Sequence, residues 1–145
     1  VSDIITLHDY EEVGDTLYKR YTEYKDQILT TEVYHSGKSA LANGYEYKGQ
    51  PIIISEYGGI AFNNDDSGWG YGNKVNTKED FIKRFDDITT AVKKIPYCCG
   101  FCYTQVSDVQ QEINGLMDME RNFKVEPEII QEINERKVGY WRTFM

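Results

Sequence analysis

The aliphatic run from Pro51 to Ile54 constrains the fold of this chain more than any other stretch. A β-branched run without polar alternation predicts a strand of a parallel sheet that is buried on both faces. Pro51 fits the first position of such a strand, where a missing amide donor is tolerated. The strand ends in Glu56, and a charged group there is costly unless it is paired or used. Glu56 is therefore a candidate functional residue, and a structural carboxylate satisfied by nearby amides is the alternative.

Two further strands are predicted, and a helical pattern follows each of them. Ile4 to Leu7 forms the first strand and Cys98 to Thr104 the third. Strands that alternate with helices predict a parallel sheet with right-handed crossovers. Asp15 and Thr77 are the expected helix N-caps, and Pro127 suits the first turn of the last helix. The apolar stripes expected to face the core are Leu17, Tyr21, Tyr24 and Ile28, then Phe81, Phe85, Ile88, Val92 and Ile95, and finally Ile129, Ile130 and Ile133.

The long polar segments of the sequence follow strands rather than helices. Residues 60–76 are expected to form such a loop, and this loop holds Trp69. In parallel α/β proteins the loops at the carboxyl ends of the strands form the active site. The sequence therefore predicts that Tyr10, Glu56 and Tyr103 lie on one rim.

Composition narrows the classes of partner. The chain has 145 residues, which suits one domain (1–145), and its net charge of −8 argues against nucleic acid and anionic membranes as partners. No apolar run reaches the length of a membrane span. Cys98, Cys99 and Cys102 are expected to be buried free thiols in a reducing compartment, which predicts a cytoplasmic protein. No metal and no cofactor are expected, because both histidines lie far from the cysteines in sequence. The charged segment Lys78 to Lys94 is expected to be a solvated helix face.

Three segments, in order along the chain, resemble glycoside hydrolase family 2, the β-galactosidase and β-glucuronidase group. Ser55-Glu56-Tyr57-Gly58-Gly59 resembles the nucleophile strand, which is the seventh strand of the family's barrel. Residues 2–10 resemble the sixth strand, and residues 100–105 resemble the eighth. The resemblance covers nearly the whole chain and implies the C-terminal portion of a TIM (β/α)8 barrel, about three β/α units (strands 6 to 8). The loop that continues the third match contains Asp108, Glu112, Asn114, Gly115, Leu116 and Arg121.

The resemblance implies roles for individual residues. Glu56 corresponds to the nucleophile of a retaining β-glycosidase, which attacks the anomeric carbon and forms a glycosyl-enzyme intermediate. Tyr10 matches the tyrosine that hydrogen-bonds and orients this nucleophile. Tyr103 replaces a tryptophan that forms the floor of the sugar subsite, with plain packing as the alternative. We also expect His8 to reach a sugar hydroxyl and Trp69 to wall the subsite, although both residues suit structural roles equally well.

Two departures from the family limit the comparison. Asn114-Gly115-Leu116 stands where β-glucuronidases carry an Asn-x-Lys motif, which disfavours a uronic acid, so a β-galactoside-like substrate is expected, although tyrosine in place of tryptophan at Tyr103 weakens a direct transfer of β-galactosidase specificity. The family's acid/base glutamate follows an asparagine, and the one such pair here, Asn134-Glu135, lies in the predicted last helix. A whole barrel needs about 250 residues. Because the sequence also begins at Val1, we expect a piece of a longer polypeptide that is inactive without the remainder of the barrel.

Two other classes of function remain open. An open three-stranded sheet has unpaired edges, which favour association. The chain is then a non-catalytic carbohydrate-binding or assembly fragment, completed by another chain or by a second copy of itself. In the other alternative, an unrelated α/β enzyme uses Glu56 as a metal ligand together with Asp9, which is the second acidic group at a strand end.

Overall fold

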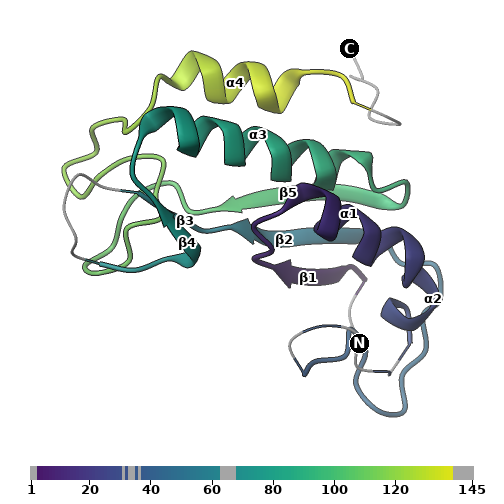
Figure 1. Ribbon diagram of the computed structural model, residues 1–145. Coiled ribbons are helices and arrows are strands. Elements are labelled where there is room, and N and C mark those ends of the chain that lie inside the picture. Colours follow the sequence, from purple (N-terminus) through teal and green to yellow (C-terminus); the bar gives the residue numbers. More distant parts are fainter. Residues whose placement is uncertain (1–2, 31, 33–34, 36, 63–67, 139–145) are drawn as a thin grey trace.

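A parallel three-stranded sheet lies at the centre of the chain (Figure 1). The computed structural model describes residues 3–30, 32, 35, 37–62 and 68–138. The strands are β1 (Ile5–Asp9), β2 (Ile52–Gly58) and β5 (Cys98–Thr104), in the order β1-β2-β5. Both pairings are parallel, so the three predicted strands and their direction are confirmed. The closing of such a sheet into a barrel stays a prediction.

The helices cover one face of this sheet. α1 (Gly14–Glu23) and the short α2 (Lys25–Ile28) connect β1 to β2, and α3 (Lys78–Lys94) connects β2 to β5. The strand order β1-β2-β5 follows the chain order, and crossovers between parallel strands have one hand, so both connections lie on the same face of the sheet. The last helix, α4 (Pro127–Glu135), packs on the outer side of α3 (Figure 1).

The core lies between the sheet and α1 and α3. In β1 the buried residues Ile5 and Leu7 alternate with the exposed residues Thr6 and His8. The prediction of strands buried on both faces was therefore wrong for β1, whereas in the central strand β2 Ile52 and Ile54 are buried and Ile53 is half-buried. The stripes of α1, α2 and α3 meet the face of the sheet that the helices cover. Their fully buried members are Leu17, Tyr21, Ile28, Phe81, Phe85, Ile88, Val92 and Ile95.

The helix boundaries confirm some of the predicted signals and correct others. Thr77 is the N-cap of α3, and its hydroxyl accepts a hydrogen bond from the amide of Asp80 at 3.0 Å. Asp15 is not a cap, because α1 begins one residue earlier at Gly14. The amide of Gly14 instead donates to the carboxylate of Asp87 on α3 at 2.7 Å. Tyr24 ends the helix as its exposed C-cap, so it does not belong to the buried stripe.

The segment predicted as one long loop contains two short strands. β3 (Ile60–Phe62) and β4 (Tyr71–Val75) form a second, two-stranded parallel sheet. Residues 63–67 of this predicted loop lie outside the described residues. Hydrogen bonds join the described ends of this segment to the end of β5 and to the loop after β5. Sequence patterning alone does not reveal these long-range bonds.

The charged helix α3 is not solvated along its whole length. Lys93 is 3% exposed, and its ammonium group donates to the carbonyls of Ile133, Asn134 and Arg136 at the end of α4. A cation on the last carbonyls of a helix satisfies their unpaired oxygens and the helix dipole. Burial lowers the pKa of Lys93. The prediction of a solvated face therefore fails at Lys93, because α4 packs against this part of α3.

The cysteines are free thiols, as expected, but only Cys98 is buried. Cys99 and Cys102 are exposed, because β5 is an edge strand and the helices cover one face of the sheet. Among the described residues, no helix has the length and apolar character needed to cross a membrane.

Candidate active site

Glu56 lies at the carboxyl end of β2, beside the end of β1. Its Oε2 atom accepts a hydrogen bond from the hydroxyl of Tyr10 and lies 3.2 Å from Nδ1 of His8. An irregularity in the strand pairing makes this meeting possible. Leu7 pairs with Ile54, but the next residue, His8, pairs with Glu56, so one residue of β2 is passed over. The predicted contact between Tyr10 and Glu56 is present, and His8 joins it.

The two carboxylate oxygens of Glu56 have different surroundings. Tyr10 and His8 hold Oε2, whereas Oε1 has no hydrogen-bond partner within the part of the chain that the structure describes. The side chain is 41% exposed, so the carboxylate is accessible to an approaching molecule. Burial, followed by the hydrogen bond to Glu56, raises the pKa of Tyr10. The phenol therefore stays protonated at neutral pH and remains a donor to the carboxylate, as an oriented nucleophile requires.

A cavity of about 740 Å³ opens at this edge of the sheet. It contains two further acidic side chains, but both are engaged in structural contacts. Glu11 binds Arg20 at 2.9 Å and accepts hydrogen bonds from two backbone amides. Glu12 accepts hydrogen bonds from both nitrogens of Asn73 and forms an ion pair with Arg84. The lining residues are Thr6, Leu7, His8, Tyr10, Glu11, Glu12, His35, Lys38, Ser39, Ala40, Glu56, Tyr71 and Gly72.

Asp9, the other acidic group at a strand end, has a structural partner. Its carboxylate is fully buried, and Nη1 of Arg20 donates to its two oxygens at 2.7 and 2.6 Å. Burial of the guanidinium opposes its charge, but hydrogen bonds to Asp9 and Glu11 outweigh this effect and raise the pKa of Arg20. Because Arg20 occupies both oxygens, Asp9 is poorly suited to share a metal ion with Glu56.

Tyr103 lies on the helix side of the sheet and does not line the cavity. Its hydroxyl accepts a hydrogen bond from the amide of Ile60 and donates to the carbonyl of Asn114, each at 3.2 Å. Its ring contacts Phe85 edge-on at a centroid distance of 5.1 Å. Gly58, with φ of +87°, leaves room for this ring, since a Cβ atom there would lie 2.3 Å from it. Burial raises the pKa of Tyr103. These contacts favour the packing alternative for Tyr103.

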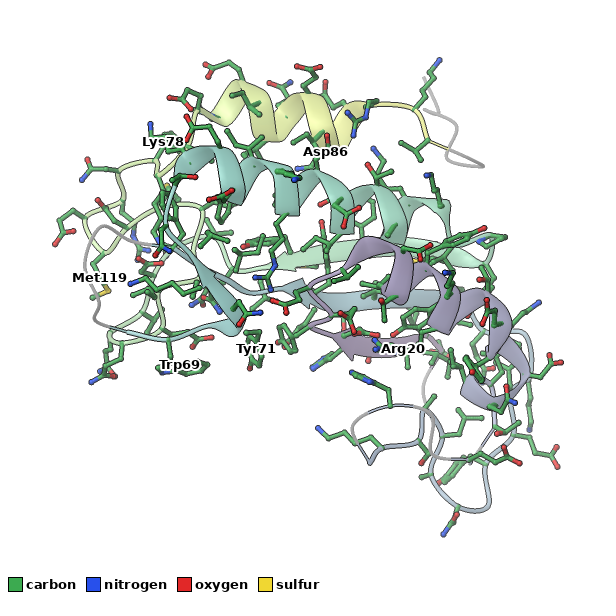
Figure 2. The ribbon with its side chains drawn as sticks, viewed as in Figure 1. Arg20, Trp69, Tyr71, Lys78, Asp86 and Met119 are labelled. Atoms are coloured by element: carbon green, nitrogen blue, oxygen red, sulfur yellow. The ribbon has the colours of Figure 1, made fainter. Side chains whose placement is uncertain are left out.

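Two aromatic residues of the segment after β3, Trp69 and Tyr71, lie near each other (Figure 2) and continue the candidate site. The ring of Tyr71 stacks on Tyr10, with centroids 3.5 Å apart and an angle of 8° between the planes. Trp69 meets Tyr71 edge-on at 5.9 Å and is half-exposed. Trp69 therefore lies next to the residues of the cavity without lining it. Sequence reasoning missed Tyr71, and its place two residues after Trp69 in a predicted active-site loop was the available signal.

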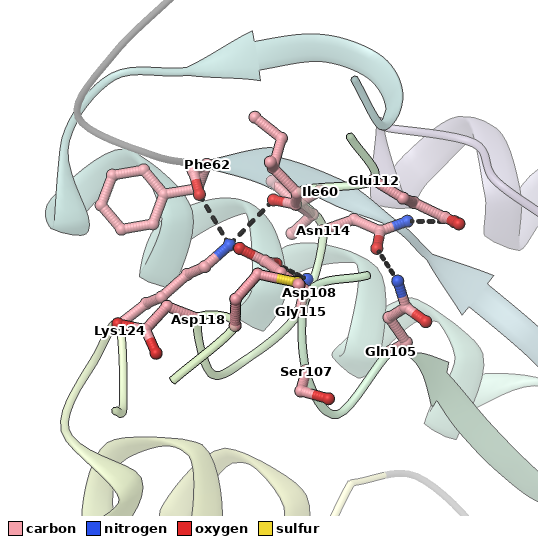
Figure 3. A network of polar contacts seen from close by, with 12 residues as sticks. Ile60, Phe62, Gln105, Ser107, Asp108, Glu112, Asn114, Gly115, Asp118 and Lys124 are labelled. Atoms are coloured by element: carbon pink, nitrogen blue, oxygen red, sulfur yellow. Dashed lines mark hydrogen bonds and ion pairs between the residues drawn. The ribbon is translucent and has the colours of Figure 1, made fainter. Parts of the chain in front are cut away.

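The loop after β5 is fixed by a buried ammonium group (Figure 3). Nζ of Lys124 donates to Asp108 Oδ1 at 2.7 Å, and to the carbonyls of Phe62 and Ile113 at 2.7 and 2.9 Å. Asp108 also accepts a hydrogen bond from the amide of Gly115 at 2.8 Å. Burial lowers the pKa of Lys124, against the opposing effect of Asp108. Lys124 thus joins this loop to β3, and nothing local in the sequence indicated it.

Comparisons with known proteins add no family assignment. Neither a scan against protein-family models nor a search of curated proteins found a match to this chain.

Proposed function

We propose that this chain supplies the nucleophile part of a retaining β-glycosidase of the glycoside hydrolase family 2 type. The observation that carries the proposal is the hydrogen bond from Tyr10 to Oε2 of Glu56, a side chain that lines the cavity. Oε1 of Glu56 has no hydrogen-bond partner among the described residues. The resemblance of residues 55–59 to the family's nucleophile strand supports the same role.

In this mechanism Oε1 of Glu56 attacks the anomeric carbon while the bond to the leaving oxygen breaks. The leaving oxygen takes a proton from a second carboxyl group, which in retaining enzymes lies about 5 to 5.5 Å from the nucleophile. Water then cleaves the glycosyl ester, the second carboxylate accepts its proton, and Glu56 is released. Glu11 and Glu12 are tied to Arg20 and Arg84, so the acid/base group belongs to the remainder of the proposed barrel.

One face of the sheet, here called the bare face, is covered by no helix among the described residues. This feature supports the assignment of β1, β2 and β5 as strands 6 to 8 of a TIM (β/α)8 barrel. In such a barrel alternate side chains point inward and helices cover the outside, which matches the alternation in β1. β1 and β5 each have one edge without a strand partner among the described residues, where neighbouring barrel strands would pair. The partner that we propose for these strand edges is the remainder of the barrel. The exposed free thiols of Cys99 and Cys102 suit a reducing, cytoplasmic compartment.

The proposed substrate is a terminal β-glycoside with an uncharged, β-galactoside-like sugar. His8 lies beside the nucleophile, where a sugar hydroxyl would approach, and the exposed indole of Trp69 offers a flat apolar face near the cavity. Tyr103 supports the rim from the helix side rather than contacting the sugar.

Covalent labelling tests this proposal. An activated dinitrophenyl fluoro-β-galactoside needs no acid for departure of its leaving group, so it reports on the nucleophile alone. The sample is the full-length polypeptide, in which this chain is joined to the remainder of the proposed barrel. We expect it to gain one fluorosugar, on the peptide that contains Glu56. Glu56→Gln should abolish the label, whereas Glu79→Gln, an exposed residue of α3, should leave it unchanged. A label on another residue would overturn the assignment.

The same bare face and free edges favour a second candidate, a non-catalytic assembly fragment. Here the 145-residue chain associates with itself through β1 or β5. Light scattering separates this candidate from the first, because a well-folded monomer at all concentrations contradicts it. Hydrolysis of nitrophenyl β-galactoside by the purified chain would contradict both the assembly candidate and the expected lack of activity of the isolated chain.

A further inference from the structure

The side chain that holds Glu56 has little support from the sheet itself. Tyr10 follows the last residue of β1, so it lies beyond the strand pairing of β1 with β2. The turn after the strand is fixed by Asp9, whose carboxylate accepts the amide of Glu11 at 3.0 Å. This turn places the backbone of Tyr10, but the direction of its ring depends on side-chain contacts.

Those contacts come from Tyr71. The two rings are nearly parallel, with 8° between their planes and 3.5 Å between their centroids. The backbone of Tyr71 is itself fixed: its amide donates to the carbonyl of Gly59 at 2.8 Å, and its carbonyl accepts from Arg84 at 3.1 Å. Tyr71 is therefore a fixed surface against which the ring of Tyr10 lies.

Gly59 is shaped for this pair of rings. Its φ is +60°, and a Cβ atom at this position would lie 2.4 Å from the ring of Tyr71 and 3.1 Å from the ring of Tyr10. Any larger residue would push the two rings apart and would be strained at this φ. The stack of Tyr10 on Tyr71 thus explains why a glycine stands at position 59, directly after β2.

We propose that Tyr71 is a positioning residue for Glu56 and acts through the ring of Tyr10. Tyr71 limits the movement of Tyr10, and Tyr10 keeps its hydroxyl on Oε2 of Glu56, so that Oε1 is left for the reaction. The ring of Tyr71 supplies the stack, and its hydroxyl also interacts with Tyr10 and helps to raise the pKa of that residue. Its effect on catalysis rests on the proposed glycosidase function, but the effect on the position of Tyr10 does not.

Nuclear magnetic resonance on the 145-residue chain tests the positional part. We expect nuclear Overhauser contacts between the Tyr10 ring and the Glu56 side chain in the wild type. Tyr71→Phe should keep these contacts, because the ring remains, and Tyr71→Leu should lose them. Trp69→Leu is the matched control, since Trp69 touches Tyr71 and not Tyr10, and it should keep them. Contacts that persist in Tyr71→Leu, or are missing in the wild type, would overturn the proposal.

A measurement on the wild type keeps the test decisive if Tyr71→Leu does not fold. The stack predicts slow flipping of the Tyr10 ring, because a flip needs the two rings to separate. Fast flipping of Tyr10 would overturn the proposal without any variant.

Labelling with the fluoro-β-galactoside tests the catalytic part. In the full-length polypeptide, Tyr71→Leu should slow the labelling of Glu56 on the order of tenfold, the size expected for one lost aromatic contact. Tyr71→Phe should label faster than Tyr71→Leu, and Glu79→Gln should label at the wild-type rate. If the wild type is not labelled while the ring contacts behave as expected, the glycosidase proposal fails and the role of Tyr71 stands. If the wild type is labelled and Tyr71→Leu changes neither readout, the role of Tyr71 is wrong and the function stands.

Discussion

Replacement of Lys124 by methionine tests whether the buried ion pair holds the loop after β5. The side chains of Lys124 and Asp108 are 8% and 6% exposed, and they meet at 2.7 Å. Lys124→Met keeps most of the apolar volume but leaves the Asp108 carboxylate buried without its cation. Breaking a buried pair from one side costs about 3 to 5 kcal/mol. Since the amide of Gly115 still binds Asp108, we expect the lower end, a loss of about 3 kcal/mol in the free energy of unfolding.

Urea unfolding followed by circular dichroism measures this loss. Lys78→Met is the matched control, because Lys78 and Glu126 meet at 3.0 Å with side chains 50% and 54% exposed. Solvent screens an exposed pair, so the control should change the free energy of unfolding little. The double variant Lys124→Met/Asp108→Asn should recover part of the loss, because no buried charge remains. Equal effects of Lys124→Met and Lys78→Met would refute the reasoning that burial decides the cost.

Three further predictions concern the core and the pH dependence. Tyr57→Phe removes the buried hydrogen bond to Thr89 at 2.9 Å and should cost about 1 kcal/mol in urea unfolding, whereas an unchanged midpoint would show that this bond adds nothing. Arg20→Met strands the buried carboxylate of Asp9 and should cost about 3 kcal/mol or more, measured in the same way. Burial opposes ionisation of Asp86, but its hydrogen-bonded guanidinium partner outweighs it and lowers the pKa of Asp86. This stability is present above the unfolded pKa of about 3.9 and is lost as the pH falls through the lower folded value, so Asp86→Asn should flatten the acid limb of an unfolding titration.

Local patterns in the sequence predicted the parts of the fold that local interactions determine. The β-branched run before Glu56 and the capping residue Thr77 gave correct elements, because strand and cap preferences need few distant contacts. The predictions that Asp15 is a helix N-cap and that Lys93 is solvated were wrong for one common reason. The start of α1 is set by Asp87 from α3, and the environment of Lys93 is set by the end of α4. Contacts between elements distant in sequence override both local signals.

The candidate site was partly predictable for a similar reason. Adjacent parallel strands bring their carboxyl ends together, so the meeting of Tyr10 and Glu56 followed from the order of the elements. The direction of Tyr103 did not follow, because it depends on the irregular pairing between β2 and β5 and on space left by Gly58. Tyr71 was missed because its position depends on bonds to Gly59 and Arg84 that no periodicity indicates.

The residue passed over in β2 decides which side of the sheet receives the negative charge. In strict alternation after the buried Ile54, Ser55 would point outward and Glu56 inward, toward the apolar helices. The extra residue reverses this phase, so Glu56 turns outward and Tyr57 inward to meet Thr89. Deletion of Ser55 would remove the extra residue and restore strict alternation after Ile54, in which Glu56 still turns outward and Tyr57 still turns inward. The extra residue is therefore what allows two residues, Ser55 and Glu56, to stand on the outward side between the inward side chains of Ile54 and Tyr57.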